Sequence, residues 1–212
     1  MDQSSRRRGK SCWYKTVGLA AINDALILES LIYKLLKKHF ADEPCYIKLV
    51  DLFHEITFRT EIGQLLDLTA IEEGSSDKLA RFTLDRYCQT IKNKTAYYSF
   101  VLPVQAALVL TGQDDPVSMK EAENILTELG QFFQIQDDYL DVFGNPEVIG
   151  KVGTDIEEGK CTWLAIQFIQ RATEEELETF KDSIGVAEHR LAVDTLYREM
   201  GLDKVYDAYQ NT

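Results

Sequence analysis

The sequence predicts an all-α fold. Apolar residues recur with the helical period of 3.6 through long stretches, and only four prolines interrupt 212 residues. No stretch of useful length alternates apolar and polar side chains as a half-buried strand does. The composition is 45% hydrophobic and 27% charged, and it contains no repeat and no linker rich in proline or glycine. We therefore expect a single domain over residues 1–212 with one sizeable core.

Three long helices are expected in the N-terminal half. The first covers residues 17–40, and the second covers 44–71, where a proline occupies the first turn. Asp77 is a suitable N-cap for a third helix over 78–110. Pro103 lies inside this third range, so the helix should kink or shift its register there.

The C-terminal half predicts a further series of helices. Residues 116–143 form the longest periodic stretch, and residues 145–159 have the composition of a loop. Thr173 and Glu176 have the spacing of a capping box at the start of another helix. Three more helical ranges are expected: 161–171, 186–200 and 202–209.

An acidic cluster stands out within the range 116–143. Gln134, Asp137, Asp138 and Asp141 are spaced i, i+3, i+4, i+7, so one helix face carries all four. Apolar residues cover most of the remaining circumference, which predicts a buried helix. Buried carboxylates need positive partners. The need is greater here because the three carboxylates lie near the C-terminal end of the helix, where the macrodipole disfavours negative charge. Mg²⁺ bridging to phosphate oxygens is one suitable partner; a polar edge facing water is the alternative.

Two other polar groups lie on apolar backgrounds. They are Thr60, Gln64 and Asp67 at i, i+4, i+7, and Lys94, Thr95 and Tyr98 before an apolar run. Gly63 would allow a ligand or another helix to approach closely. The alternative for both groups is a helix edge that meets water, with Gly63 as a packing residue.

Several basic residues could compensate the charge of these acidic residues or bind phosphate beside them. Arg6, Arg7 and Arg8 offer guanidinium groups that bind phosphate oxygens bidentately. Lys151 and Lys160 flank a short loop after the acidic helix, where they would add positive charge. The alternatives are a solvated basic tail or a nuclear-localisation patch for the arginines, and ordinary loop lysines for the other two residues.

Charge and cysteine content narrow the class of protein. The net charge of −12 argues against broad nucleic-acid binding. No apolar stretch reaches the roughly 20 residues that span a bilayer. The four cysteines are widely separated, without CxxC or Cys/His metal spacing, and are interpreted as free thiols of a reducing compartment. The cytoplasm is the expected location; a targeting signal upstream of Met1 is the alternative.

Several of these motifs together resemble the short-chain trans-prenyl diphosphate synthases, and most of all the farnesyl-diphosphate-forming members of eukaryotes. Residues 132–141 resemble the second aspartate-rich motif of that family, and residues 151–156 its lysine loop. Three shorter signatures are similar as well: 94–95, 60–64, and 7–9 followed by 12–14. The resemblance runs over essentially the whole chain.

The resemblance implies an isoprenoid-synthase-type helical bundle around a central cavity. It also implies Mg²⁺-dependent condensation of an allylic diphosphate with isopentenyl diphosphate, with Mn²⁺ as a possible substitute. The implied metal ligands are Asp2, Asp137, Asp138 and Asp141. The implied substrate contacts are Arg7, Arg8, Thr60, Gln64, Lys94, Gln134, Lys151 and Lys160. Of the implied catalytic residues, Lys94 and Lys151 hold the allylic diphosphate, and Thr95, Tyr98 and Gln134 flank the developing cation.

Compared with the family pattern, the chain begins inside the first aspartate-rich motif, of which Met1 and Asp2 match the last two positions. It is therefore expected to be an incomplete domain, inactive as it stands, and part of a homodimer at full length. Two other functions stay open: a non-catalytic short subunit, and a terpene synthase that ionises an allylic diphosphate without isopentenyl diphosphate. Product length is not predicted, because the positions that set it in the family precede Met1.

Overall fold

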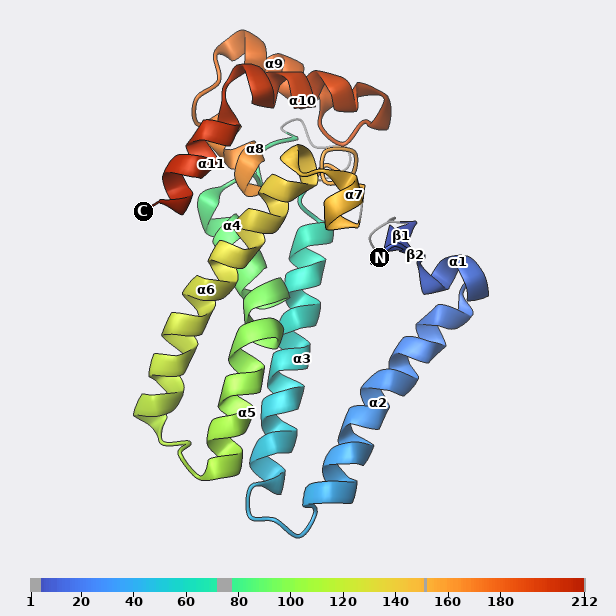
Figure 1. The fold of residues 1–212 in the computed structure, drawn as a ribbon, viewed down its shortest axis with the longest axis vertical. Helices are drawn as coiled ribbons and strands as arrows, with labels where there is room; N and C mark the ends of the chain where they lie inside the picture. The colour runs from blue at the N-terminus through green and yellow to red at the C-terminus, as the bar shows by residue number, and fades with distance from the viewer. Residues whose placement is uncertain (1–4, 72–77, 151, 212) are drawn as a thin grey trace.

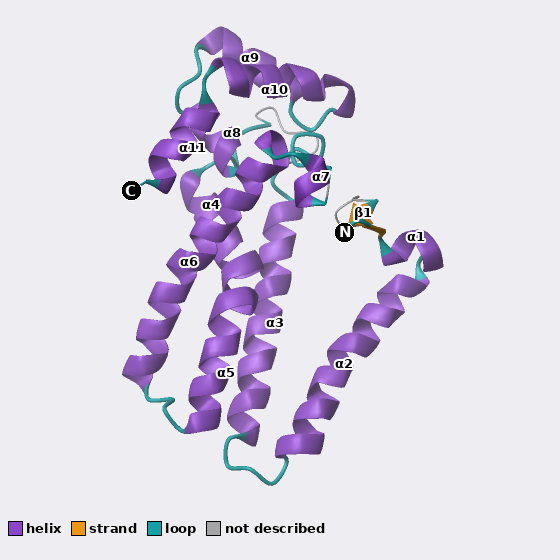
Figure 2. Ribbon diagram, in the orientation of Figure 1, coloured by secondary structure: helices purple, strands orange, loops and turns teal. Residues whose placement is uncertain are grey.

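A computed structural model describes residues 5–71, 78–150 and 152–211. Nearly all regular structure in these ranges is helical, which confirms the all-α prediction (Figure 2). The exception is a small hairpin in which β1 (Arg6–Arg7) pairs antiparallel with β2 (Lys10–Ser11). Arg8 and Gly9 turn this hairpin with positive φ angles of 52° and 73°. No helix of the described residues is long and apolar enough to cross a membrane.

Long helices form the body of the molecule, and most of the shorter ones lie toward its upper end, whereas α1 adjoins α2 at the side. The long elements are α2 (Ala20–Phe40), α3 (Tyr46–Leu68), the π-helix η1 (Lys92–Val101) with its continuation α5 (Leu102–Thr111), and α6 (Pro116–Phe143). The shorter elements are α1 (Trp13–Val17), α4 (Leu84–Ile91), α7 (Pro146–Ile149), α8 (Trp163–Ile169), α9 (Glu174–Ser183), η2 (Ala187–His189), α10 (Arg190–Glu199) and α11 (Leu202–Gln210). The continuous rod η1–α5 runs between α3 and α6, and α9 and α10 cross over the upper end (Figure 1).

Two helix starts differ from the sequence prediction. The helix predicted over 17–40 begins only at Ala20, because Gly18, with a φ of 63°, ends the separate helix α1 just before it. The helix expected from residue 78 begins only at Leu84, because the Thr83 hydroxyl accepts the Arg86 N–H at 3.2 Å and caps it there. The preceding Phe82 is buried in the core. Asp77, the predicted cap, lies outside the described residues.

The irregularity expected at Pro103 lies before it. Residues 92–101 form a π-helix that widens the rod and then joins α5, where Pro103 occupies the first turn. Proline removes a backbone hydrogen bond to the preceding turn and clashes with a carbonyl there, so the irregular turns precede Pro103. The change of register therefore falls on the segment that carries Lys94, Thr95 and Tyr98.

The C-terminal predictions hold with one correction. Helix α6 ends at Phe143 as expected, and the Thr173–Glu176 capping box is present, with contacts of 3.3 and 2.8 Å. The range 145–159, predicted to be a loop, contains the short helix α7. The Asn145 side chain caps this helix by accepting the Glu147 N–H at 2.9 Å.

The main core lies at the upper end, under α9 and α10. It is built on fully buried side chains of α8 to α11: Leu164, Phe168, Phe180, Val193, Tyr197 and Leu202. A second cluster around Leu36 and Leu49 joins α2 to α3 near their connection. Above it α2 diverges from α3 (Figure 1), and apolar side chains such as Leu19 and Leu28 are exposed.

The prediction that α6 is buried all round is only partly right. Ile135, Asp138 and Asp141 are buried, but Ile125, Leu129 and Phe133 expose 67%, 48% and 48% of their surface. The exposed stripe belongs to the half of α6 that the upper core does not cover.

A polar link ties η1 to both of its neighbours. The Arg59 guanidinium of α3 donates to the Tyr97 hydroxyl at 3.0 Å, and this hydroxyl donates to the Glu123 carboxylate of α6 at 3.0 Å. Tyr97 is buried, and the Arg59 guanidinium also lies over its ring, 4.7 Å from the centroid. One hydroxyl thus connects three helices.

We expect Tyr97→Phe to lower the free energy of unfolding by about 1.5–3 kcal/mol, because it removes hydrogen bonds to two charged groups. Tyr206→Phe is the matched control: that hydroxyl is buried and has no hydrogen-bond partner among the described residues. Its loss should change stability by less than about 0.5 kcal/mol. Urea unfolding measures both variants. Equal effects of the two substitutions would contradict the assignment.

Candidate functional site

A cavity of about 680 Å³ opens where α3, η1 and α6 meet the hairpin and the loop after α7. Most predicted site residues line it: Arg7, Arg8, Thr60, Gln64, Lys94, Thr95, Tyr98, Gln134, Asp137, Asp138, Asp141 and Lys160. Asp2 and Lys151 lie outside the described residues. Segments up to 150 residues apart in the sequence therefore meet at one site.

Several residues that line the cavity were not predicted from the sequence. Tyr87, Thr90 and Ile91 precede Lys94 at helical spacing, so the face of α4 could have been read as continuous with that lysine. Cys161 also lines the cavity, and burial raises the pKa of its thiol to about 12. A thiolate is the reactive form of cysteine, so burial disfavours nucleophilic chemistry at Cys161.

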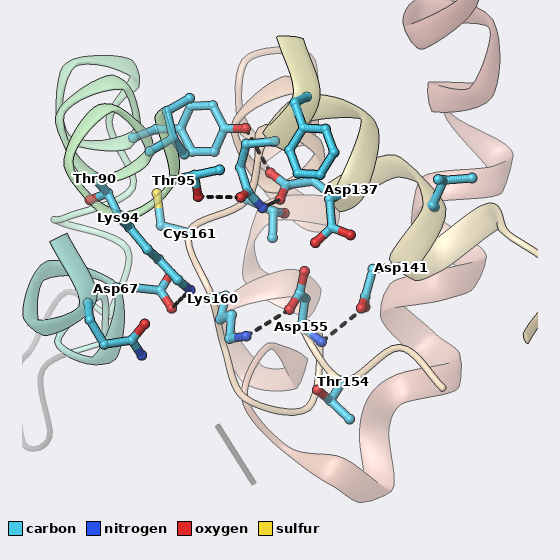
Figure 3. A pocket seen from close by; sticks show the side chains of 18 of the residues that line it. Asp67, Thr90, Lys94, Thr95, Asp137, Asp141, Thr154, Asp155, Lys160 and Cys161 are labelled. Carbon is cyan, nitrogen blue, oxygen red and sulfur yellow. Dashed lines mark hydrogen bonds and ion pairs between the residues drawn. The ribbon is translucent and has the colours of Figure 1, made fainter. Parts of the chain in front are cut away.

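Lys94 meets Asp67 at the cavity wall. Their side chains form an ion pair of 2.6 Å, and they expose only 22% and 11% of their surface (Figure 3). The two helices approach closely here because Gly63 has no side chain; a Cβ on it would overlap the backbone of Asn93 and Lys94. Of the two expectations for Gly63, close approach of another helix is the one observed.

A chain of hydrogen bonds runs along the wall of the cavity to Asp138. The Thr95 hydroxyl donates to Gln134 Oε1 at 2.7 Å, and Gln134 Nε2 donates to Asp138 at 2.9 Å. Asp138 also accepts the Tyr87 hydroxyl and the Trp163 N–H, both at 2.8 Å. Asp138 is buried, which raises the pKa of its carboxyl to about 7, with a smaller contribution from Asp155.

These contacts give Asp138 a different setting from the other two aspartates of the motif. Its oxygens are engaged by the protein, so it is better placed to orient α6 than to meet a ligand. Asp137 projects into the cavity (Figure 3). Asp141 accepts the backbone N–H of Asp155 at 3.1 Å, and Asp155 pairs with Lys160 at 3.0 Å.

The donor set fits a hard cation only together with ligand oxygens. Among the described residues, no three His, Cys, Asp or Glu side chains are grouped to hold a metal ion by themselves. Asp137, Asp141 and Asp155 nevertheless line the same cavity. Mg²⁺ is commonly bound by one or two carboxylates plus substrate phosphates, and this arrangement could supply that. The metal role predicted from the sequence for Asp137, Asp138 and Asp141 stays a prediction.

The sequence is similar to a known protein family over most of its length. Residues 1–200 match the polyprenyl synthetase family. The chain belongs to this family. Its sequence is 49% identical to the farnesyl pyrophosphate synthase of Bos taurus over 214 residues, which cover 99% of the chain and 60% of that protein. It is 45% identical to the farnesyl pyrophosphate synthase of Saccharomyces cerevisiae, over 100% of the chain and 61% of the relative.

Solved structures of the polyprenyl synthetase family share the fold. Farnesyl diphosphate synthase of Trypanosoma brucei complexed with minodronate superposes with a TM-score of 0.92 at 37% identity, covering 100% of the chain and 62% of that structure. The same enzyme complexed with the bisphosphonate BPH-1326 gives 0.91 at 36% identity, covering 99% and 76%. The chain thus spans about 60% of the length of the curated relatives reported above.

Proposed function

We propose that this chain carries the diphosphate-binding half of a farnesyl diphosphate synthase site. The reaction is the condensation of an allylic diphosphate, dimethylallyl or geranyl, with isopentenyl diphosphate. The observation that supports it is one cavity with the Asp137–Asp141 face on one wall and Lys94, Arg7 and Arg8 on others. The farnesyl pyrophosphate synthases among its relatives supply the substrate class.

The cations of the cavity would hold the two diphosphates. Lys94 is fixed by Asp67 at 2.6 Å and would exchange this partner for an allylic diphosphate oxygen. Arg7 would bind the same group, together with Lys151 and Lys160, and Arg8 the isopentenyl diphosphate. Thr60 and Gln64 line the cavity beside Asp67 and would complete the substrate contacts.

Asp137 and Asp141 would hold Mg²⁺, joined by Asp155 and Asp2. When bound, the ions supply Lewis-acid stabilisation of the departing diphosphate. Asp138 would keep these carboxylates in register through its bonds to Tyr87, Gln134 and Trp163. This division of roles within the motif rests on the contacts of Asp138, whose two carboxylate oxygens accept hydrogen bonds from three other residues.

Three side chains would stabilise the allylic cation. Tyr98 offers a ring face, and the Thr95 hydroxyl and Gln134 amide offer dipoles. The 2.7 Å bond between Thr95 and Gln134 holds both dipoles at the wall of the cavity. The isopentenyl alkene would attack this cation, and a proton would then leave, with the released diphosphate as its acceptor.

Product analysis tests the proposal. A full-length version incubated with geranyl diphosphate, labelled isopentenyl diphosphate and MgCl₂ should give farnesyl diphosphate, and only when both substrates are present, whereas the 212-residue chain should give little or none. Hydrocarbon or alcohol formed from geranyl diphosphate alone would identify a terpene synthase instead. Binding of both diphosphates without turnover would identify the non-catalytic subunit.

A further inference from the structure

The loop between α7 and α8, residues 150–162, carries cavity residues without a long helix to hold them. Thr154 and Asp155 line the cavity from this loop. On its inner side, the Asp155 N–H donates to Asp141 at 3.1 Å. Gly153 packs against the Asp141 carbonyl so closely that a Cβ would overlap it. The position of the loop therefore decides where Thr154 and Asp155 stand relative to α6.

An arginine of α10 holds the outer side of the same loop. One guanidinium nitrogen of Arg190, Nη1, donates to the Gly153 carbonyl and, at 2.9 Å, to the Glu157 carboxylate. Arg190 and Glu157 are about one-third exposed. Gly153 is thus held between Asp141 on one side and Arg190 on the other.

The ion pair between Arg190 and Glu157 also reduces the negative charge of the loop. The loop carries three carboxylates close together, Asp155, Glu157 and Glu158, beside a site that would take polyanions. Lys160 pairs with two of them, Asp155 at 3.0 Å and Glu158 at 3.2 Å. Glu157 is the carboxylate that Arg190 pairs, so Arg190 compensates its charge next to the site.

We propose that Arg190 is a positioning residue for the diphosphate site. Acting through Gly153 and Glu157, it fixes the loop in the register that turns Thr154 and Asp155 toward the cavity. Arg190 is on α10, behind the loop, and is not among the residues that line the cavity. The link to ligand binding rests on the proposed function.

Hydrogen exchange tests the positioning without any ligand. In Arg190→Gln, amides of residues 152–160 should exchange roughly 10-fold faster, while amides of α3 and α6 keep their protection. Arg171→Gln is the matched control, because its guanidinium bonds only the Gln167 carbonyl of the preceding helix α8 among the contacts seen, at 2.8 Å. Arg190→Lys keeps the positive charge but loses the planar guanidinium with its several donors. Its loop amides should therefore exchange at a rate between those of Arg190→Gln and the control.

Titration with inorganic diphosphate in MgCl₂ tests the link to the site. Arg190→Gln should raise the half-saturating concentration about 10-fold, with the thermal midpoint nearly unchanged. Unchanged loop exchange would overturn the proposal. A lower thermal midpoint with unchanged affinity would also overturn it, since the role would then be structural only. If the wild-type chain binds no diphosphate, the proposed function fails, and the exchange result still decides whether Arg190 positions the loop.

Discussion

Gly63→Ala should lower the free energy of unfolding by about 1–3 kcal/mol. A Cβ at this position would overlap the backbone of Asn93 and Lys94, and backbone atoms cannot turn away as a flexible side chain does. In an exposed helix the same change would stabilise by up to about 1 kcal/mol, because alanine is the better helix former. The steric overlap should outweigh the better helix preference of alanine, because α3 and η1 would have to separate to accommodate the Cβ.

Urea unfolding of Gly63→Ala gives the result directly. Glu61→Ala is the matched control on the exposed side of the same helix, and it should stay within about 0.5 kcal/mol of wild type. Because η1 also carries Lys94 and Thr95, the folded Gly63→Ala protein should bind diphosphate more weakly. A variant as stable as wild type would show that the two helices do not need this close approach.

Asp137→Asn should weaken Mg²⁺-dependent binding of an allylic diphosphate roughly 10- to 100-fold, the range found when the surroundings of a bound metal are altered. The change keeps the shape of the side chain and removes its charge, so the loss would come from the metal site. Any turnover should fall by about 100-fold or more, since stabilisation of the leaving group is the main electrostatic contribution.

Glu128→Gln controls for charge on the same helix, because Glu128 is exposed and lies outside the cavity. It should bind like wild type. Calorimetric titration at fixed MgCl₂ compares the three proteins. A similar affinity for Asp137→Asn and wild type would remove Asp137 from the site.

Local pattern predicted the helices and most of the site. The spacing of Gln134, Asp137 and Asp141 placed them on one face of α6, and the Thr173 capping box appeared as expected, because both depend on neighbours within one or two turns. The start of α4 at Leu84 was missed, because tertiary packing of Phe82 overrides the weak preference of residues 78–82 for a helix.

Contacts between segments that are distant in the chain could not be predicted from the local sequence pattern. The bonds that engage Asp138 come from Tyr87 and Trp163, on two other helices, so its difference from Asp137 is a tertiary property. The π-helix could not be predicted from the sequence either. Its wide turns place Lys94 against Asp67, but the apolar pattern of residues 92–101 does not distinguish a π-helix from an α-helix. Arg190 reaches a loop 37 residues away.

Calorimetric titration of the wild-type chain with an unreactive thio analogue of geranyl diphosphate, in MgCl₂ and in EDTA, tests the central claim most directly. The claim is that the Asp137–Asp141 face and Lys94 together hold a metal-bound diphosphate. Saturable binding at one site in MgCl₂, weakened at least about 10-fold by EDTA, is the expected result. Equal affinity in the two buffers, or no binding in MgCl₂, would contradict it.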